Sequence, residues 1–180
     1  MKEEIVIAGF GGQGVLSMGK ILAYAALMKD LEVTWMPSYG PEQRGGTANV
    51  TVIISDEPIS SPVLDSYDTV IALNQQSLDK FEPKVKSGGL LIYDPSGIHH
   101  PPTRTDITVL PVDVMTAMIT LGNPKGYNMI LLGSLLKMRP IVELEHVLKG
   151  LKKALPERHH HLIPANEKAI LTGMDLVEVK

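Results

Sequence analysis

The 180-residue sequence contains no cysteine. Without thiols the chain forms no disulfide, holds no iron–sulfur cluster through cysteine and uses no thiol nucleophile. Any iron–sulfur chemistry must therefore be brought by another chain. Histidine does not fill the gap, because the contiguous side chains of His159-His160-His161 cannot all converge on one metal ion. We expect this run and His99-His100 to lie in solvated loops, and we predict no metal site.

Long apolar runs and concentrations of positive charge are also missing. No stretch reaches the roughly 18 apolar residues that span a membrane, and the N-terminus enters a strand-like segment instead of a signal peptide. The net charge is −3, the pI is about 6.1, and Lys and Arg form no basic stripe. These features argue against membranes and nucleic acid as partners and predict a cytoplasmic protein.

Glycine, in contrast, is concentrated near the N-terminus. Gly9-Phe10-Gly11-Gly12-Gln13-Gly14 follows the apolar run Ile5–Ala8 and opens an apolar helix over 13–29. Such a turn needs glycine because the chain bends sharply and its N–H groups must face a neighbour directly. Together with the helix N-terminus, Gly9, Gly11, Gly12, Gln13 and Gly14 predict a seat for a phosphate or a carboxylate. The alternative is that these glycines only pack the helix closely on a sheet.

A second unusual loop covers residues 37–46 and contains Tyr39, Gly40, Glu42, Arg44, Gly45 and Gly46. It leaves the carboxyl end of the second predicted strand, so we expect it beside the first loop, where open α/β sheets place ligands. Arg44 could clamp a carboxylate or phosphate with two hydrogen bonds. The alternative is a structural ion pair with Glu42 or another neighbour.

The order of apolar segments predicts one α/β domain over 1–180, a Rossmann-like three-layer α/β/α sandwich with a mixed, mostly parallel sheet. The loop over 37–46 is too short for a parallel crossover, so the third strand should run antiparallel to the second. Strands are expected over 3–9, 32–36, 47–55, 68–73, 90–94 and 107–112. Helices are expected over 13–29, 75–81, 114–121, 128–138, 142–155 and from 164 onward.

Two standard nucleotide-binding patterns are incomplete. A dinucleotide site needs an acidic residue about 20 positions after the glycines, but Thr34-Trp35-Met36 stand there and Glu32 lies at the wrong end of the strand. No Gly-Lys-Ser/Thr sequence follows the glycines, so a P-loop is not supported either. The sequence shows no Ser-His-Asp set, and catalytic residues remain unknown. A stand-alone nucleotide- or CoA-binding Rossmann-like protein stays open as an alternative.

Two predicted helices are apolar on nearly every side. They are the helix over 13–29 and the segment 129–136 within the helix over 128–138. Since a helix that is apolar all round is buried all round, we expect another chain to cover part of both. A homodimer of the isolated chain is one way to do so.

Three motifs in order resemble one known family. Gly9–Val15, Ser38–Glu42 with Arg44–Gly46, and Ile163–Ala169 together resemble the γ subunit of 2-oxoacid:ferredoxin oxidoreductases. The same module is similar to domain III of single-chain pyruvate:ferredoxin oxidoreductase. The resemblance extends over essentially the whole chain.

The resemblance implies a subunit of an enzyme of anaerobic metabolism. Such an enzyme converts a 2-oxoacid (2-oxoisovalerate, 2-oxoglutarate or pyruvate) to acyl-CoA and CO2 and reduces ferredoxin. It implies thiamine diphosphate with Mg2+ on the α and β subunits, and [4Fe-4S] clusters on cysteine-bearing chains, including a ferredoxin-like δ subunit. We expect this chain to bind no cofactor by itself, to be inactive alone, and to present its two glycine-rich loops to the active-site or coenzyme A region. A structural subunit whose loops bind nothing is the remaining alternative.

Overall fold

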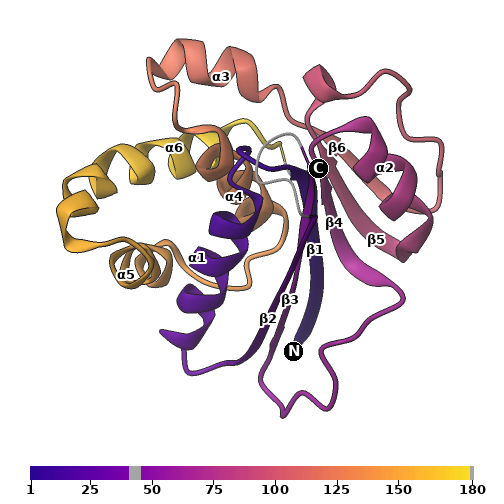
Figure 1. Cartoon of the computed structure of the whole chain (residues 1–180), viewed down its shortest axis with the longest axis horizontal. Coiled ribbons are helices and arrows are strands. Elements are labelled where there is room, and N and C mark those ends of the chain that lie inside the picture. The colour runs from indigo at the N-terminus through magenta and orange to yellow at the C-terminus, as the bar shows by residue number, and fades with distance from the viewer. Residues whose placement is uncertain (41–45, 179–180) are drawn as a thin grey trace.

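The computed structural model describes residues 1–40 and 46–178. Its centre is a sheet of six strands in the order β2-β3-β1-β4-β5-β6 (Figure 1). Only β3 runs against the other five, because it pairs antiparallel with both β2 and β1. The predicted mixed, mostly parallel sheet is therefore confirmed. The strands are β1 (Lys2–Phe10), β2 (Glu32–Tyr39), β3 (Thr47–Ser55), β4 (Tyr67–Ala72), β5 (Val85–Tyr93) and β6 (Thr108–Pro111).

Helices cover both faces of the sheet unequally. Figure 1 shows α1, α4, α5 and α6 on one side and α2 on the other, which confirms the three-layer arrangement. The helices are α1 (Val15–Leu27), α2 (Gln75–Phe81), α3 (Val114–Leu121), α4 (Tyr127–Met138), α5 (Leu144–Ala154) and α6 (Ile163–Asp175).

The sequence of the central strand β1 is continuously apolar because both of its faces are buried. Ile5 and Ile7 belong to the large core under α1 and α4, whereas Val6 and Ala8 belong to the smaller core on the α2 side. Alternate side chains of a strand point to opposite faces, and here both faces are covered. No residue between Ile5 and Ala8 is more than 1% exposed.

Two boundaries differ from the sequence-based expectation. Strand β2 continues to Tyr39 instead of ending at Met36, and Gly40 N donates to Thr47 O at 3.1 Å. Because successive residues of an edge strand alternate between pairing with the neighbouring strand and pointing away from it, this bond places the nitrogen of Pro37 on the side away from β3. Pro37 has no N–H to donate, and at that open edge the sheet loses no hydrogen bond. Residues 157–162, expected as a loop, form the 3-10 helix η3 (Glu157–Leu162).

The chain's own helices cover the apolar surfaces of α1 and α4. All eight residues from Met129 to Leu136 are buried, and α1 packs so closely on α5 that a Cβ at Gly150 would lie 2.8 Å from Ala25 N. The expectation that another chain covers these two helices is wrong for α4. On α1 a partner chain has only exposed residues such as Leu27, which is 47% exposed, to cover.

Ion pairs gather at the edge of the sheet where the parallel strands begin, here called the amino edge. Lys86 Nζ lies 2.7 Å from Asp68 Oδ1 and also pairs with Glu4, which in turn contacts Lys2. Arg104 Nε donates to Asp106 Oδ1 at 2.8 Å just before β6. These groups anchor the starts of β1, β4, β5 and β6.

The Asp106 pair predicts a dependence of stability on pH. Hydrogen bonding from Arg104 lowers the pKa of Asp106 from 3.8 to about 2. A carboxyl whose pKa is lower in the folded state contributes stability above its unfolded pKa and loses it as the pH falls toward the folded value. We expect the urea midpoint of the native chain to fall more steeply between about pH 4 and pH 2 than that of Asp106→Asn. Asp65→Asn, an exposed aspartate before β4, is the control. Parallel slopes for native chain and Asp106→Asn would contradict the assignment.

Candidate functional site

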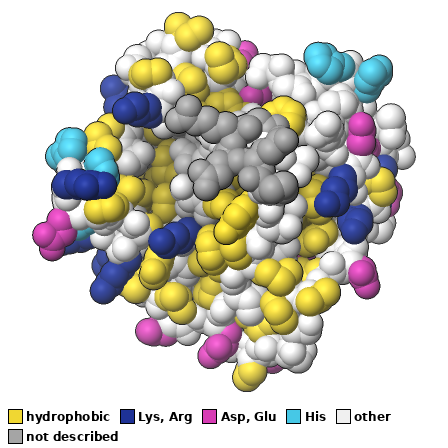
Figure 2. All heavy atoms as spheres, viewed as in Figure 1, with side chains coloured by type: hydrophobic (Ala, Val, Ile, Leu, Met, Phe, Trp, Pro, Cys, Tyr) yellow, Lys and Arg dark blue, Asp and Glu magenta, His cyan; other side chains and the backbone are white. Residues whose placement is uncertain are grey.

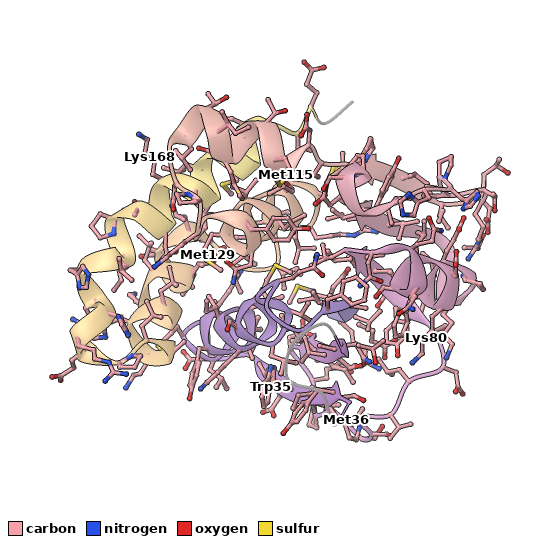
Figure 3. All side chains as sticks on the ribbon, turned by 45° about the horizontal axis from the view of Figure 1, so that its top comes forward. Trp35, Met36, Lys80, Met115, Met129 and Lys168 are labelled. Atoms are coloured by element: carbon pink, nitrogen blue, oxygen red, sulfur yellow. The ribbon has the colours of Figure 1, made fainter. Side chains whose placement is uncertain are left out.

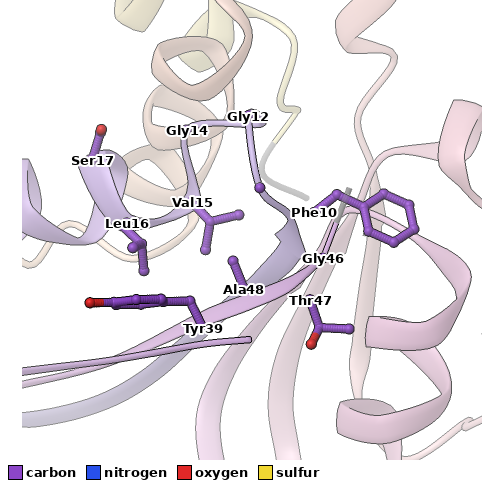
Figure 4. Close-up of a pocket in the computed structure, with 11 residues that line it drawn as sticks. Phe10, Gly12, Gly14, Val15, Leu16, Ser17, Tyr39, Gly46, Thr47 and Ala48 are labelled. Atoms are coloured by element: carbon purple, nitrogen blue, oxygen red, sulfur yellow. The ribbon is translucent and has the colours of Figure 1, made fainter. Parts of the chain in front are cut away.

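A cavity of about 560 Å3 opens at the opposite edge of the sheet, here called the carboxyl edge. The loop after β1 and the base of the β2–β3 hairpin meet there, since Gly11 N donates to Gly46 O at 2.9 Å. The described end of the second glycine-rich loop, Gly46, therefore lies beside the first loop. The cavity is lined by Phe10, Gly11, Gly12, Gly14, Val15, Leu16, Ser17, Tyr39, Gly46, Thr47 and Ala48 (Figure 4).

Two glycines of the loop have backbone conformations that other residues rarely adopt. Gly12 has φ +100° and Gly14, the N-cap of α1, has φ +74°. A Cβ at Gly12 would meet no described atom within 4 Å, whereas a Cβ at Gly14 would lie 2.5 Å from Asn128 Nδ2. The first position therefore needs glycine for its backbone angle, and the second also for close packing.

Gln13 supports the loop instead of facing the cavity. Its Oε1 accepts from Phe10 N at 2.6 Å, and its Nε2 donates to Leu73 O at 3.3 Å. The side chain thereby fastens the turn to the end of β4. A Cβ at Gly9 would lie 2.5 Å from the same Oε1, so Gly9 serves close packing, the alternative given for the glycines above.

The structure brings five of the eleven predicted site residues to the cavity wall: Gly11, Gly12, Gly14, Tyr39 and Gly46. Gly9, Gln13 and Gly40 are not among the lining residues. Glu42, Arg44 and Gly45 lie outside the described residues, and so does the expected clamp by Arg44.

Sequence inspection missed several wall residues. Ser17 and Leu16 come from the first turn of α1, and Thr47 and Ala48 from the start of β3. Figure 4 shows the Tyr39 ring beside Leu16, while the Phe10 ring points away from the other labelled side chains. Tyr39 is 69% exposed and stands at the mouth of the cavity. The missed wall residues lie next to a glycine-rich segment in the sequence, and that position could have predicted them.

The described wall offers backbone N–H donors but few side-chain groups for chemistry. It contains no Asp, Glu, His, Lys or Arg, and its polar side chains are the hydroxyls of Ser17, Tyr39 and Thr47. The N–H groups of Gly12 and Gly14 find no acceptor among the described residues. In the first turn of α1 the N–H groups have no partner within the helix, and its dipole favours negative charge there. Phosphate and carboxylate groups suit this wall.

Helix α4 supports the glycine-rich loop between β1 and α1. Asn128 Nδ2 approaches Gly14 O at 3.4 Å, which places the first turn of α4 against the start of α1. The neighbouring Tyr127 donates its hydroxyl to Asp94 Oδ2 at 2.6 Å, and Asp94 Oδ1 accepts from Ser96 N at 2.9 Å. Burial, together with this bond to Asp94, raises the pKa of Tyr127. The phenol therefore stays protonated and keeps α4 tied to the end of β5.

Tyr127→Phe is expected to destabilise the chain by about 2 kcal/mol, because Asp94 would keep a buried carboxylate oxygen without its donor. Asp94 is only 2% exposed, so water cannot easily replace the phenol. Urea unfolding of the two chains measures the difference. Tyr24→Phe is the control, because the Tyr24 hydroxyl on α1 has no hydrogen-bond partner among the described residues. Equal stabilities of the two variants would show that the Asp94 bond contributes little.

Within residues 1–40 and 46–178, no group of three or more His, Cys, Asp or Glu side chains could hold a metal ion. Across the same residues, no helix has the length and apolar character needed to cross a membrane.

Comparison with known proteins gives one consistent family. Residues 4–176 match the family described as pyruvate ferredoxin/flavodoxin oxidoreductase. The 2-oxoglutarate synthase subunit KorC of Methanocaldococcus jannaschii is 34% identical over 160 residues, 87% of this chain and 86% of the relative. Ketoisovalerate oxidoreductase subunit VorA of Methanothermobacter thermautotrophicus is 54% identical over 91 residues. That match covers 51% of this chain but only 19% of VorA, so the matched part is about a fifth of that relative.

Solved structures show the same module in two contexts. The γ subunit of a keto/oxoacid ferredoxin oxidoreductase from Geobacter sulfurreducens has a TM-score of 0.79 and 31% identity, over 98% of this chain and 96% of that one. A 2-oxoglutarate:ferredoxin oxidoreductase from Magnetococcus marinus, with 2-oxoglutarate, coenzyme A and succinyl-CoA bound, has a TM-score of 0.86 and 25% identity. That match covers 97% of this chain and 31% of the M. marinus chain.

Proposed function

Since the chain belongs to the pyruvate ferredoxin/flavodoxin oxidoreductase family, we propose that it acts as the γ subunit of a 2-oxoacid:ferredoxin oxidoreductase. The enzyme decarboxylates a 2-oxoacid, forms an acyl-CoA and passes the electrons to ferredoxin. The names of the relatives KorC and VorA support 2-oxoglutarate or 2-oxoisovalerate as the substrate. Subunits of α and β type carry thiamine diphosphate with Mg2+, and a cysteine-bearing δ-type subunit carries [4Fe-4S] clusters.

The observation that carries this division of labour is the composition of the cavity wall. The backbone N–H groups of Gly12 and Gly14 have no acceptor among the described residues, yet the described wall has no carboxylate, imidazole or amine to move a proton. A chain of this kind positions a ligand while the reacting groups stand on its partners.

Coenzyme A fits the cavity as the anionic ligand. Its phosphate groups match the N–H groups of Gly12 and Gly14 and the first turn of α1. Tyr39, exposed at the mouth, offers an aromatic face for the base. Coenzyme A, when bound, supplies the thiol that receives the acyl group. The residues of this chain bind and orient it, and Gln13 and Asn128 keep the loop in shape.

A stand-alone nucleotide- or CoA-binding protein is not favoured. The acidic residue of a dinucleotide site is missing, since Glu32 begins β2 at the amino edge, far along the strand from the cavity. The described cavity wall also lacks a set of reacting side chains.

The test is anaerobic purification of the tagged chain from its native cells, with mass identification of co-purifying chains and an assay of 2-oxoacid-dependent viologen reduction. We expect a thiamine-binding chain and a cysteine-rich chain to co-purify, with activity that depends on coenzyme A. The isolated chain, assayed in parallel, should be inert. Recovery of this chain alone, inactive with every 2-oxoacid but binding a nucleotide, would overturn the proposal.

A further inference from the structure

The two edges of the sheet differ in their ion pairs. The amino edge carries the ion pairs Met1–Asp56, Lys86–Asp68 and Arg104–Asp106. At the carboxyl edge, among the described residues, no salt bridge joins the loop after β1, the ends of β4 and β5 or helix α3. Exposed ion pairs are typical of solvated surfaces, so the amino edge is the less suitable of the two edges for an apolar contact.

Helix α3 exposes large apolar side chains at the carboxyl edge. The sequence from Val114 to Pro124 has no Asp, Glu, Lys or Arg. Met115 and Ile119, one turn apart and therefore on the same face, are 45% and 79% exposed. Figure 2 shows hydrophobic side chains gathered at the top of the molecule, over α3. Figure 3 places Met115 there, away from Trp35 and Met36 of β2.

The helix is fixed in place, so its outer face is an ordered surface. Val114 and Ala117 on the inner face are 0% and 5% exposed. Asp113 caps the first turn by accepting from Thr116 N at 3.0 Å. Gly122, with φ +66°, ends the helix. A rigid apolar face loses little conformational entropy when a partner covers it.

The comparisons show the kind of polypeptide beside which this module occurs. A region similar to 97% of this chain forms 31% of a longer polypeptide in the M. marinus enzyme. In G. sulfurreducens a similar module makes up 96% of a separate chain. A module found both joined and separate works beside the rest of the oxidoreductase. The described part of its cavity wall lacks reacting groups, so we expect the edge that holds the cavity to face the chain that has them.

We infer that Met115 and Ile119 of α3 dock into an uncharged groove on the chain that holds the reaction centre. This inference rests on the proposed function. A second copy of the present chain is the less suitable occupant, because it would cover the carboxyl edge without bringing a group that reacts.

The test replaces Ile119 by aspartate and compares the variant with Val63→Asp. Val63 is 69% exposed on the connector between β3 and β4, at the amino edge. Both variants place a charge on an exposed apolar position, so both should keep the melting temperature of the isolated chain. We expect Ile119→Asp to weaken association with the partner subunits by about ten-fold or more, because the new carboxylate loses its hydration without gaining a partner. Val63→Asp should associate as the native chain does.

Association is measured by titrating tagged variants into the enzyme complex from which the γ subunit has been removed. The recovered 2-oxoacid-dependent viologen reduction and the co-purification of the partner subunits are followed. If Ile119→Asp unfolds the chain, Ile119→Ser and Met115→Gln take its place. Equal association of Ile119→Asp and Val63→Asp would overturn the inference while leaving the subunit role intact. A dimer of the native chain alone that Ile119→Asp dissociates would also overturn it, in favour of a second copy. Failure of the native chain to associate with any partner would instead refute the proposed function.

Discussion

Replacement of Gly133 by alanine is expected to destabilise the chain by about 3 kcal/mol. Gly133 on α4 and Gly173 on α6 let the two helices touch backbone to backbone. A Cβ at either position would lie 1.9 Å from a carbonyl oxygen of the other helix, Ile170 O or Ile130 O respectively. Because the obstacle is backbone, no side-chain rotation relieves it, and the helices must move apart. The gain of about 1 kcal/mol in helix propensity for alanine does not offset this cost.

Gly19→Ala is the matched control for Gly133→Ala. Gly19 is also inside a helix, but a Cβ there would meet the side chain of Val50, with Cγ1 at 2.6 Å. A methyl group can shift where a carbonyl cannot, so we expect a loss of only about 1 kcal/mol. Urea unfolding followed by circular dichroism measures both. Equal losses would mean that α4 and α6 separate easily, contrary to their burial.

Gly12→Ala is expected to raise the coenzyme A concentration at half-maximal activity of the holoenzyme by about 10- to 100-fold. Alanine fits the space left by the described residues, none of which has an atom within 4 Å of the Cβ position, but it rarely adopts φ +100°. The strain of about 1–2 kcal/mol turns the peptide toward negative φ and moves its N–H away from the cavity. Hydrogen bonds to a charged phosphate are worth about 1.5–3 kcal/mol each. The maximal rate should change much less than the half-saturating concentration.

Gly88→Ala separates this effect from general strain. Gly88 has φ +75° and equally open space around its Cβ position, but it lies at the start of β5, at the amino edge. We expect a similar small loss of stability and an unchanged dependence on coenzyme A. If Gly12→Ala also left that dependence unchanged, the loop would not hold the phosphates, and the structural alternative for the glycines would be correct.

The local parts of the fold were predictable because their causes are local. The loop over 37–46 has too few residues for a parallel crossover, and β3 is indeed antiparallel to β2. Asp113 and Gly122 mark the ends of α3 by their capping chemistry. The resemblance to the γ-subunit family, given by short motifs, agrees with the family match over residues 4–176.

The partners of the apolar helices were not predictable from the same patterns. An apolar circumference shows that a helix is buried but not which chain buries it. Segment 129–136 is covered by α6, whose close approach depends on Gly133 of α4 meeting Ile170 and on Gly173 of α6 meeting Ile130. The expectation of a covering partner chain failed there, because only the packed structure identifies the neighbour.

The candidate site divides in the same way. The sequence by itself determined that a glycine turn joins β1 to α1, because backbone angles and helix entry depend on consecutive residues. Only the tertiary structure decided that the Gln13 side chain donates a hydrogen bond to Leu73 O, 60 positions away. It also decided that Asn128 contacts Gly14, 114 positions away. Contacts at such separations arise from the packing of whole elements, and no local spacing in the chain records them.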